Sequence, residues 1–530
     1  DIQIVEPVIP VKRNSSGTFR RLNQHDELPA SGSRAFGESF SDPYLSLQWH
    51  YNNTGKINHA AEGADIRLFD AWITTTGHPD VIVAVVDGGI DYTHVDLAAN
   101  IWVNTAEKNG TASKDDDANG YKDDIYGYNF VTGRAIEPTL HGTHVAGIIG
   151  AVNNNGIGVG GIAGGDGTAN SGVRLMSCQV FLDDEQGERS ATNFYTAAAI
   201  KYGVDNGAVI CQNSWGFDLG TVSSTPTLIK EAIEYFIANA GMDEHSNQEG
   251  PMKGGIVLFA AGNDTTSSPS YPAFDDNVIS VSAMGPDYVR ATYSNYGPTV
   301  DIIAPGGEMS HDPVRGRTGV LSTGAGWDGT GIAKNAYYYM DGTSMSCPQV
   351  SGIAALIVSH YGVGTPGFTS AQLKERLYAA TYDISVYNNG YDGKLGVGAL
   401  DGGKAFLPDA ISPQPPVLRK SVPNLAFTRL DDQYTLMLGD YFASAEENDE
   451  LVYNVSVGTD GIISFHLVNN ELQLTTAGYG KTNVTLTVTG KNGLQTKAGF
   501  LVSCSSRTKI PGGNQPGLWT WEGSGELTGQ

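Results

Sequence analysis

Consecutive apolar residues alternate with segments of helical pattern between residues 78 and 305. The strand-like segments are VIVAVVD (81–87), VRLMSCQV (173–180), AVICQNSWG (208–216), GIVLFAAGN (255–263), VISVSAM (278–284) and VDIIAPG (300–306). Helix-like segments lie at 141–152, 191–207 and 226–241, and one at 347–362 is apolar on nearly every side. Strands that are apolar on both faces and separated by helices are typical of a parallel sheet covered on both sides. The pattern therefore predicts a three-layer α/β domain with a mostly parallel central sheet.

The pattern changes after the proline-rich segment ISPQPPVL (411–418). Beyond it, apolar residues recur at every second position, as at Val484, Leu486 and Val488, and Gly/Asn turns separate the segments. Short alternating strands of this kind predict a small all-β sandwich. We therefore expect four parts: an N-terminal extension (1–41), the α/β domain (42–412), the sandwich (416–505) and a flexible Gly/Ser/Pro-rich tail (506–530).

Composition narrows the classes of function. The 530 residues carry 32 Lys and Arg against 57 Asp and Glu, a net charge of −25. Such a balance argues against a nucleic-acid partner, which requires clustered basic residues, and no apolar run is long enough to predict a membrane-spanning segment. The widely spaced cysteines favour buried thiols over a zinc site, although a bridge between Cys178 and Cys211 stays open. Because the chain begins with Asp1 and lacks a signal peptide, we expect a processed or trimmed product.

Polar groups suited to catalysis stand at strand ends and helix starts, where functional groups of an α/β sheet gather. Asp87 ends the strand 81–87 and is followed by two glycines. His141 and His144 open the helix at 141–152, and their i, i+3 spacing does not distinguish between them. The stretch DGTSMSCPQV (341–350) offers Ser344 as a nucleophile, besides Ser346 and Cys347. A Ser/Thr-rich turn before a helix is usually only a cap, so each signal alone is weak.

Asn263 ends the strand 255–263, and a side-chain amide at such a place can donate to a tetrahedral oxyanion. The chain order Asp, His, Ser is one of the known orders of a Ser-His-Asp triad.

Three sequence blocks carry a resemblance to a known family. VVDGGIDYTHVDL (85–97), HGTHVAG (141–147) and GTSMSCPQVSG (342–352) resemble the signature blocks of the subtilases, the subtilisin-like serine peptidases. The resemblance implies the three-layer α/β fold. It also implies that Asp87 orients the imidazole of His141, that His141 is the general base and acid, and that Ser344 attacks the scissile carbonyl, with Asn263 binding the oxyanion.

The resemblance extends to substrate binding through NSWG (213–216) and AAGN (260–263). It implies that Ser214, Trp215 and Gly216 pair with an extended peptide as an added strand. It further implies that Ala260, Ala261, Gly262 and Ser270 line the primary specificity pocket. Trp215 and Ser270 depart from the family's common residues, which leaves side-chain preference open.

An acidic loop, DDDANGYKDD (115–124), spaces oxygen ligands like the start of an EF-hand. The candidate calcium ligands are Asp115, Asp117, Asn119, Tyr121 (through its carbonyl), Asp123 and Asp124. Tyr126 stands where an EF-hand has its closing Glu, so a true EF-hand is not expected, and a solvated acidic loop is the alternative. The family resemblance adds a second candidate calcium site with Asp96 and Asn155.

These features together predict a calcium-stabilised serine endopeptidase that acts on peptides or proteins and is secreted to an extracellular, cell-surface or periplasmic location. The segment IQIVEP (2–7) resembles the last strand of a subtilase inhibitory propeptide. This resemblance implies that residues 1–41 keep a propeptide remnant or an uncut junction near 13–41 as a partner of the enzyme. The sandwich resembles the cadherin-like or immunoglobulin-like appendages of secreted bacterial enzymes. Two alternatives stay open: a catalytically silent binding protein on the same scaffold, and an exopeptidase whose cleft is closed at one end by the Tyr-rich segment 324–340.

Overall fold

The computed structural model describes residues 7–13, 19–22, 40–184, 187–243, 245–407, 416–418, 420, 422–443, 451–490, 495–505, 519–521 and 527–529. The chain divides into two compact units, Asp1–Ile411 and Ser412–Gln530. Most of the expected junction at 13–41 and most of the expected tail at 506–530 lie outside the described residues.

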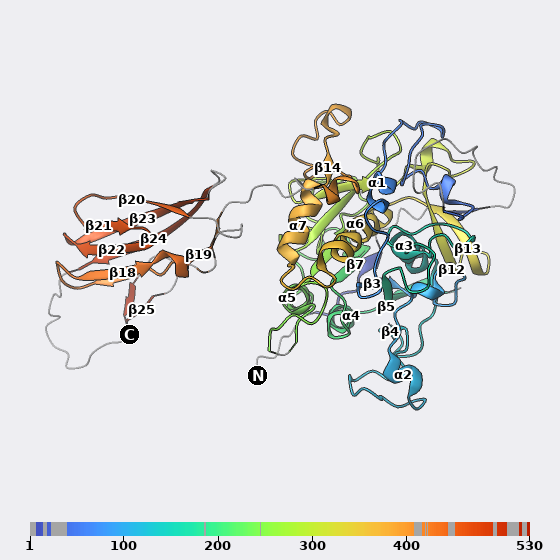
Figure 1. The fold of residues 1–530 in the computed structure, drawn as a ribbon, viewed down its shortest axis with the longest axis horizontal. Helices are drawn as coiled ribbons and strands as arrows, with labels where there is room; N and C mark the ends of the chain where they lie inside the picture. The colour runs from blue at the N-terminus through green and yellow to red at the C-terminus, as the bar shows by residue number, and fades with distance from the viewer. Residues whose placement is uncertain are drawn as a thin grey trace. The chain divides into compact units, whose positions relative to one another are not determined.

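A ten-stranded sheet forms the centre of the first unit (Figure 1). Its order is β14 (Thr381–Tyr382), β15 (Ala399–Leu400), β11 (Ile302–Pro305), β10 (Ile279–Met284), β9 (Ile256–Ala260), β7 (Ile210–Asn213), β3 (Ile82–Gly88), β5 (Arg174–Asp184) and β4 (Gly127–Asn129), with β6 (Gly187–Ser190) beside β5. Only the β14–β15 and β5–β6 pairs are antiparallel. The prediction of a mostly parallel central sheet is confirmed.

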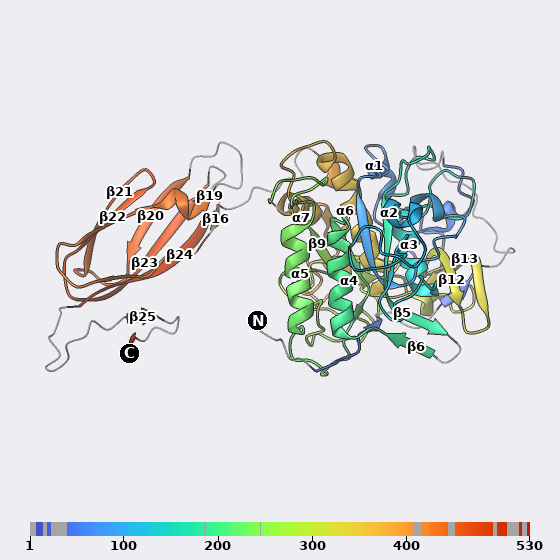
Figure 2. The same cartoon turned by 90° about the horizontal axis from the view of Figure 1, so that it is seen from below.

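Helices cover both faces of this sheet. On one face, α4 (Asn193–Asp205) and α5 (Thr227–Asn239) lie side by side, as Figure 2 shows. The other face carries α3 (Leu140–Gly150) and α6 (Thr343–Ile357), with α7 (Ser370–Ala379) against α6. Every residue of α3 and α6 is buried. For α6 this agrees with its sequence, which is apolar on nearly every side. Two shorter helices, α1 (Leu68–Trp72) and α2 (Thr105–Asn109), lie outside these layers.

A long hairpin and two N-terminal strands complete the first unit. The hairpin consists of β12 (Val320–Trp327) and β13 (Ile332–Met340), packs on α3, and contains the Tyr-rich segment 324–340. Near the N-terminus, β2 (Phe19–Arg21) pairs antiparallel with β13, and β1 (Lys12–Arg13) pairs antiparallel with β8 (Trp215–Gly216). The N-terminal extension thus adds strands to two separate edges of the unit.

The second unit is the expected β-sandwich. One sheet has the order β17 (Leu425–Phe427), β24 (Gln495–Cys504), β23 (Gly480–Thr489) and β20 (Val452–Val457), and the other has β18 (Gln433–Met437), β22 (Glu471–Thr476) and β21 (Ile463–Val468). The alternating residues Val484, Leu486 and Val488 of one sheet share a buried cluster with Leu472 and Leu474 of the other. Short pairs also form between β16 (Val417–Leu418) and β19 (Phe442–Ala443), and between β25 (Trp519–Trp521) and β26 (Leu527–Gly529).

Candidate active site

A buried Asp–His pair lies at the carboxyl edge of the central sheet. Asp87 ends β3 and His141 is the second residue of α3, which Thr139 caps by accepting a hydrogen bond from the backbone of Gly142. The Nδ1–H group of His141 donates to Oδ1 of Asp87 at 2.7 Å, and the backbone N–H of Gly88 donates to the same oxygen at 2.6 Å. Among the described residues, Nε2 of His141 has no hydrogen-bond partner. The carboxylate therefore fixes the tautomer and leaves Nε2 as the basic nitrogen.

Two glycines allow this pair to form. A Cβ atom on Gly142 would lie 2.0 Å from the carbonyl oxygen of Gly88, and one on Gly88 would lie 1.9 Å from Oγ1 of Thr139. Both distances are far below van der Waals contact, so any side chain would force the strand and helix apart. The close backbone approach is what holds His141 against Asp87.

Ser344 lies in the first turn of α6, which begins at Thr343, four residues earlier than predicted. Its hydroxyl donates to the carbonyl oxygen of Ser214 at 3.3 Å, and the Ser214 hydroxyl donates back to the Ser344 carbonyl at 3.1 Å. These bonds tie the start of α6 to the segment that leads into β8.

The neighbouring candidate nucleophiles face the interior. The hydroxyl of Ser346 donates to the carbonyl oxygen of Ala304 at 3.0 Å. The thiol of Cys347 donates to Oε1 of Gln212 at 3.3 Å, and burial raises its pKa. A buried thiol with a raised pKa is a poor nucleophile, which leaves Ser344 as the group suited to attack.

His144 has a structural role in the same helix. Its Nε2–H group is held by the carbonyl oxygens of Tyr338 at 2.9 Å and Val320 at 3.1 Å. Burial is the largest cause that lowers the pKa of His144, and together with a smaller effect of the neighbouring His141 it brings the pKa to about 3. A neutral His144 thus fastens α3 to the β12–β13 hairpin. The structure distinguishes the two histidines, which spacing alone did not.

Asn263 follows β9 and is positioned by Thr343. Its Oδ1 accepts from the backbone N–H of Thr343 at 3.0 Å and from the Thr343 hydroxyl at 2.9 Å. The backbone N–H of Gly262 donates to the same hydroxyl at 3.2 Å. With its oxygen held, the Asn263 amide presents its NH₂ group as the donor. Nothing in the local sequence around Thr343 marks its contact with residue 263.

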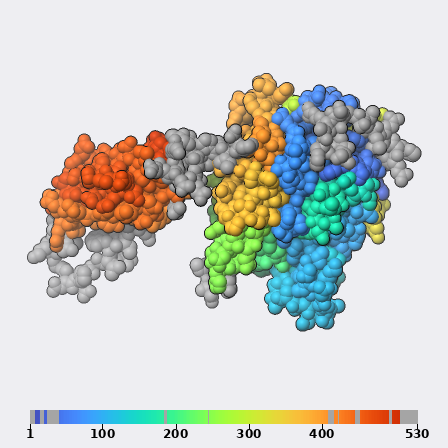
Figure 3. All heavy atoms as spheres, in the orientation of Figure 1, coloured from blue at the N-terminus to red at the C-terminus, as the bar shows by residue number. Residues whose placement is uncertain are grey.

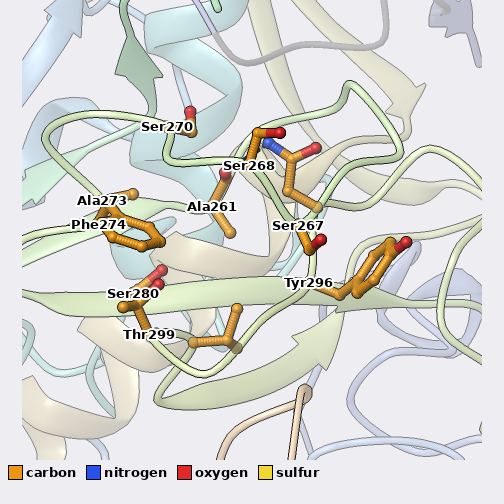
Figure 4. A pocket seen from close by; sticks show the side chains of 11 residues that line it. Ala261, Ser267, Ser268, Ser270, Ala273, Phe274, Ser280, Tyr296 and Thr299 are labelled. Atoms are coloured by element: carbon orange, nitrogen blue, oxygen red, sulfur yellow. Dashed lines mark hydrogen bonds between the residues drawn. The ribbon is translucent and has the colours of Figure 1, made fainter. Parts of the chain in front are cut away.

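A small pocket lies beside this segment. Its volume is about 20 Å³, and Figure 4 shows the side chains around it. Its lining consists of Ala261, Ser267, Ser268, Ser270, Ala273, Phe274, Ser280, Asn295, Tyr296, Thr299 and Val300. Of the expected pocket residues, Ala261 and Ser270 line it, whereas Ala260 and Gly262 do not. The lining has no charged side chain and room only for a small one.

The expected peptide-binding strand already carries an added strand. Lys12 of β1 pairs with Gly216 and Arg13 pairs with Trp215. Nearer the N-terminus of the same segment, the carbonyl oxygen of Ile9 accepts from the backbone N–H of Asn193, the first residue of α4, at 3.2 Å. The chain's own N-terminal segment therefore lies between β8 and the start of α4, as a bound peptide would.

Acidic side chains gather around the loop 115–124, in a part of the unit that protrudes below its body (Figure 3). Carboxylate oxygens of Glu107, Asp115 and Asp117 lie within 4.8 Å of one another. The backbone N–H of Asn119 donates to both aspartates, at 3.1 and 3.2 Å. Glu107 lies in α2, outside the loop, so loop spacing gave no sign of it.

The other predicted ligands of this loop have protein partners. Both carboxylate oxygens of Asp123 accept from the backbone N–H of Ser113 at 2.9 Å. Asp124 is buried and accepts from the Tyr202 hydroxyl at 2.6 Å, while burial raises its pKa. The ring of Tyr121 packs edge-on against that of Tyr202. Asp123 is therefore not part of the cluster of Glu107, Asp115 and Asp117.

Asp96 and Asn155 do lie together. Oδ1 of Asp96 accepts from the side-chain amide of Asn155 at 2.7 Å, and its Oδ2 accepts from the backbone N–H of Val159 at 2.9 Å. Asp42, which the sequence did not single out, accepts from the backbone of Asn155 at 3.1 Å. Burial raises the pKa of Asp96 to about 7, and that of Asp42 is raised for the same reason.

Comparisons with known proteins identify the family of this chain. The model of the family described as "Subtilase family" matches residues 78–398, more than half of the chain. The chain belongs to the subtilase family. "Subtilisin-like protease 1" of Plasmodium berghei is 31% identical over 383 residues, which cover 70% of this chain and 55% of that protein. "Halolysin-like extracellular serine protease Nep" of Natrialba magadii is 31% identical over 395 residues, covering 74% and 57%.

A solved structure is similar to this chain in fold. The crystal structure of a serine protease of Aeromonas sobria has a TM-score of 0.52 and 18% identity, and the match covers 94% of this chain and 97% of that one. By contrast, the chain spans about half the length of the curated relatives it matches. In the described part of the chain, no helix has both the length and the apolar character needed to cross a bilayer.

Proposed function

We propose that this subtilase is a serine endopeptidase that hydrolyses peptide bonds through Asp87, His141 and Ser344. The observation that carries the proposal is the 2.7 Å bond between His141 and Asp87, which leaves Nε2 of His141 without a partner among the described residues. A silent scaffold has no need to keep this arrangement together with Ser344.

The mechanism follows from the positions of these groups. His141 takes the proton of the Ser344 hydroxyl through Nε2 as the oxygen attacks the scissile carbonyl, and Asp87 stabilises the resulting imidazolium. The Asn263 NH₂ group and the backbone N–H of Ser344 donate hydrogen bonds to the negative oxygen. One such donor stabilises the transition state by about 3 kcal/mol. His141 returns the proton to the leaving amine, and water then hydrolyses the acyl-enzyme. The small pocket lined by Ala261 and Ser270 favours a small, uncharged side chain next to the scissile bond.

Ser344→Ala tests this function. Wild-type protein is expected to hydrolyse a mixed peptide library and to react with a fluorophosphonate at Ser344, whereas the variant does neither. Ser346→Ala is the matched control and keeps both properties, because Ser346 is bonded to the core. Hydrolysis that persists in Ser344→Ala would refute the mechanism. Internal cuts in the library separate an endopeptidase from the exopeptidase alternative.

The donor groups at two sites fit structural calcium. Calcium is bound by carboxylate, amide and carbonyl oxygens, and Asp96, Asp42 and Asn155 supply such groups in a buried cradle. Among the described residues, no Lys or Arg forms an ion pair with either aspartate, so a cation would offset two buried negative charges. Glu107, Asp115 and Asp117 supply a second set. Bound calcium would stabilise these loops without entering the reaction.

The proposed location is extracellular, at the cell surface or in a periplasm, and the name of the Natrialba magadii relative, an extracellular serine protease, supports it. We propose further that residues 1–41 are an inhibitory N-terminal segment and that the 416–505 sandwich is an accessory domain. The pairing of β1 with β8 supports the first point. N-terminal sequencing before and after incubation tests it, because self-cleavage within the first 41 residues should occur in the wild type and not in Ser344→Ala.

A further inference from the structure

Arg13, at the end of β1, is held by two carboxylates. Its Nη1 and Nη2 atoms donate to Oδ2 and Oδ1 of Asp183 at 2.6 and 2.5 Å, which is a bidentate arrangement. Its Nε atom donates to Oε2 of Glu188 at 2.7 Å, and Nη2 also bonds to that oxygen. The side chains of Arg13 and Asp183 are only 12% and 15% exposed. A planar guanidinium matches paired carboxylates in a way that a lysine ammonium does not.

The two acids are arranged for a ligand rather than for the stability of their own strands. Asp183 of β5 and Glu188 of β6 are direct cross-strand partners. Like charges directly opposite in an antiparallel pair are destabilising. One guanidinium between them offsets this repulsion, and in the described part of the chain the cation that does so is Arg13, about 170 residues distant along the sequence.

The surroundings of Asp183 extend this acidic character. Asp183 lines a pocket of about 620 Å³ between β5 and the β12–β13 hairpin, together with the carboxylates Asp91 and Glu137 and the single basic residue Lys334. The pocket leaves space for a peptide to continue past the acid pair.

The two residues before Arg13 contribute unequally to the binding of this segment. Lys12 reaches Asp218 at 2.8 Å, but the two side chains are 56% and 63% exposed, so this pair adds little. Val11 is 3% exposed and belongs to the main core cluster. A peptide bound as residues 9–13 are bound would be recognised mainly through an apolar residue and, two positions later, an arginine.

The register of the β1–β8 pair also places Arg13 close to the proposed nucleophile, Ser344. Arg13 lies opposite Trp215, and the preceding residue, Ser214, accepts the hydrogen bond from Ser344. Because the pairing is antiparallel, the nucleophile lies beyond the C-terminal end of β1. An arginine in the place of Arg13 therefore sits on the N-terminal side of the scissile bond.

We infer that Asp183 and Glu188 form an acidic subsite that selects substrates with an arginine shortly before the scissile bond, and that Arg13 of the chain's own N-terminal segment occupies this subsite. The inference rests on the proposed peptidase function. It adds a substrate class, peptides with an apolar residue two positions before an arginine, and names the two residues that determine specificity.

Paired peptides test the subsite with the full chain. Both carry Ile-Pro-Val-Lys-Xaa followed by the same mixed residues, with Xaa either arginine or its neutral isostere citrulline. Because bonds between charged partners are worth about 1.5–3 kcal/mol, wild type should prefer arginine by about 10- to 100-fold in kcat/KM. Asp183→Asn with Glu188→Gln should bring the ratio to within about 3-fold of unity. Asp80→Asn removes an exposed carboxylate paired with His78 and should keep the wild-type ratio.

A second measurement does not depend on the protein's own activity. In Ser344→Ala protein, trypsin should cut slowly after Arg13 because the acid pair holds the side chain. Adding Asp183→Asn and Glu188→Gln should raise that rate about 10-fold, while Asp80→Asn should not. Hydrolysis of both peptides at equal rates by wild type would overturn the subsite and leave the peptidase function standing. An inactive wild type in which the acid pair still protects Arg13 would refute the peptidase function and retain the arginine site.

Discussion

Gly142→Ala is expected to disable the enzyme through geometry alone. The new methyl group would lie 2.0 Å from the carbonyl oxygen of Gly88, where ordinary contact begins at 3.4 Å, so α3 and β3 must separate by about 1.4 Å. His141 is the adjacent residue and would move away from Asp87 with the helix. Misplacement by about 1 Å costs roughly 100-fold in rate. Overpacking costs about 1–3 kcal/mol of folding free energy, which exceeds the gain of up to about 1 kcal/mol from replacing glycine by alanine in a helix.

The assay compares kcat/KM on a chromogenic peptide with the urea-unfolding free energy of each variant. Gly150→Ala is the matched control in the same helix, because its methyl group would meet only the end of the Leu175 side chain, at 3.3 Å. It should change stability by less than about 1 kcal/mol and keep wild-type activity. We expect Gly142→Ala to lose about 100-fold in kcat/KM, and the overpacking cost less the helix gain to leave a net loss of up to about 2 kcal/mol of stability. Wild-type activity in Gly142→Ala would refute the reasoning.

Three further predictions concern the groups around this pair. Thr343→Val should lower kcat about 10-fold with KM little changed, because Asn263 loses one of the two bonds that orient the amide proposed to bind the oxyanion. An altered KM alone would contradict this role. His144 has a pKa of about 3 in the folded protein and 6.5 when unperturbed, so the folded state binds fewer protons than the unfolded state. The stability that His144 contributes to the folded state is therefore fully present above pH 6.5 and is lost as the pH falls toward 3. Urea unfolding at pH 7 and pH 4.5 should show this loss, reduced in His144→Gln; an equal loss in both proteins would count against it. A calcium chelator should lower the melting temperature of the wild type, and less so that of Asp117→Asn; no shift in either would exclude a stabilising calcium.

The fold class could be predicted, and Asp87, His141 and Ser344 could be proposed as one site, because their signals are local. Continuous apolar runs mark buried parallel strands, and the ends of such strands and the starts of the following helices meet at one edge of the sheet. Asp87, His141 and Ser344 each stand at such a point, so their side chains could be assigned to one site. The alternation at Val484, Leu486 and Val488 marked the sandwich in the same way.

Other features depend on contacts between distant segments, which no local pattern records. Spacing did not choose between His141 and His144, whereas the bond to Asp87 does. Glu107 joins the acidic loop from a separate helix, and Thr343 holds Asn263 across 80 residues of sequence.

The sequence by itself determined which chemical groups the protein has and at which strand and helix ends they stand. Only the tertiary structure decided how they are paired, because pairing depends on which backbones approach closely. Gly88 and Gly142 set that approach at the proposed catalytic centre. The β5–β6 register brings Asp183 and Glu188 together, so that both carboxylates bind Arg13.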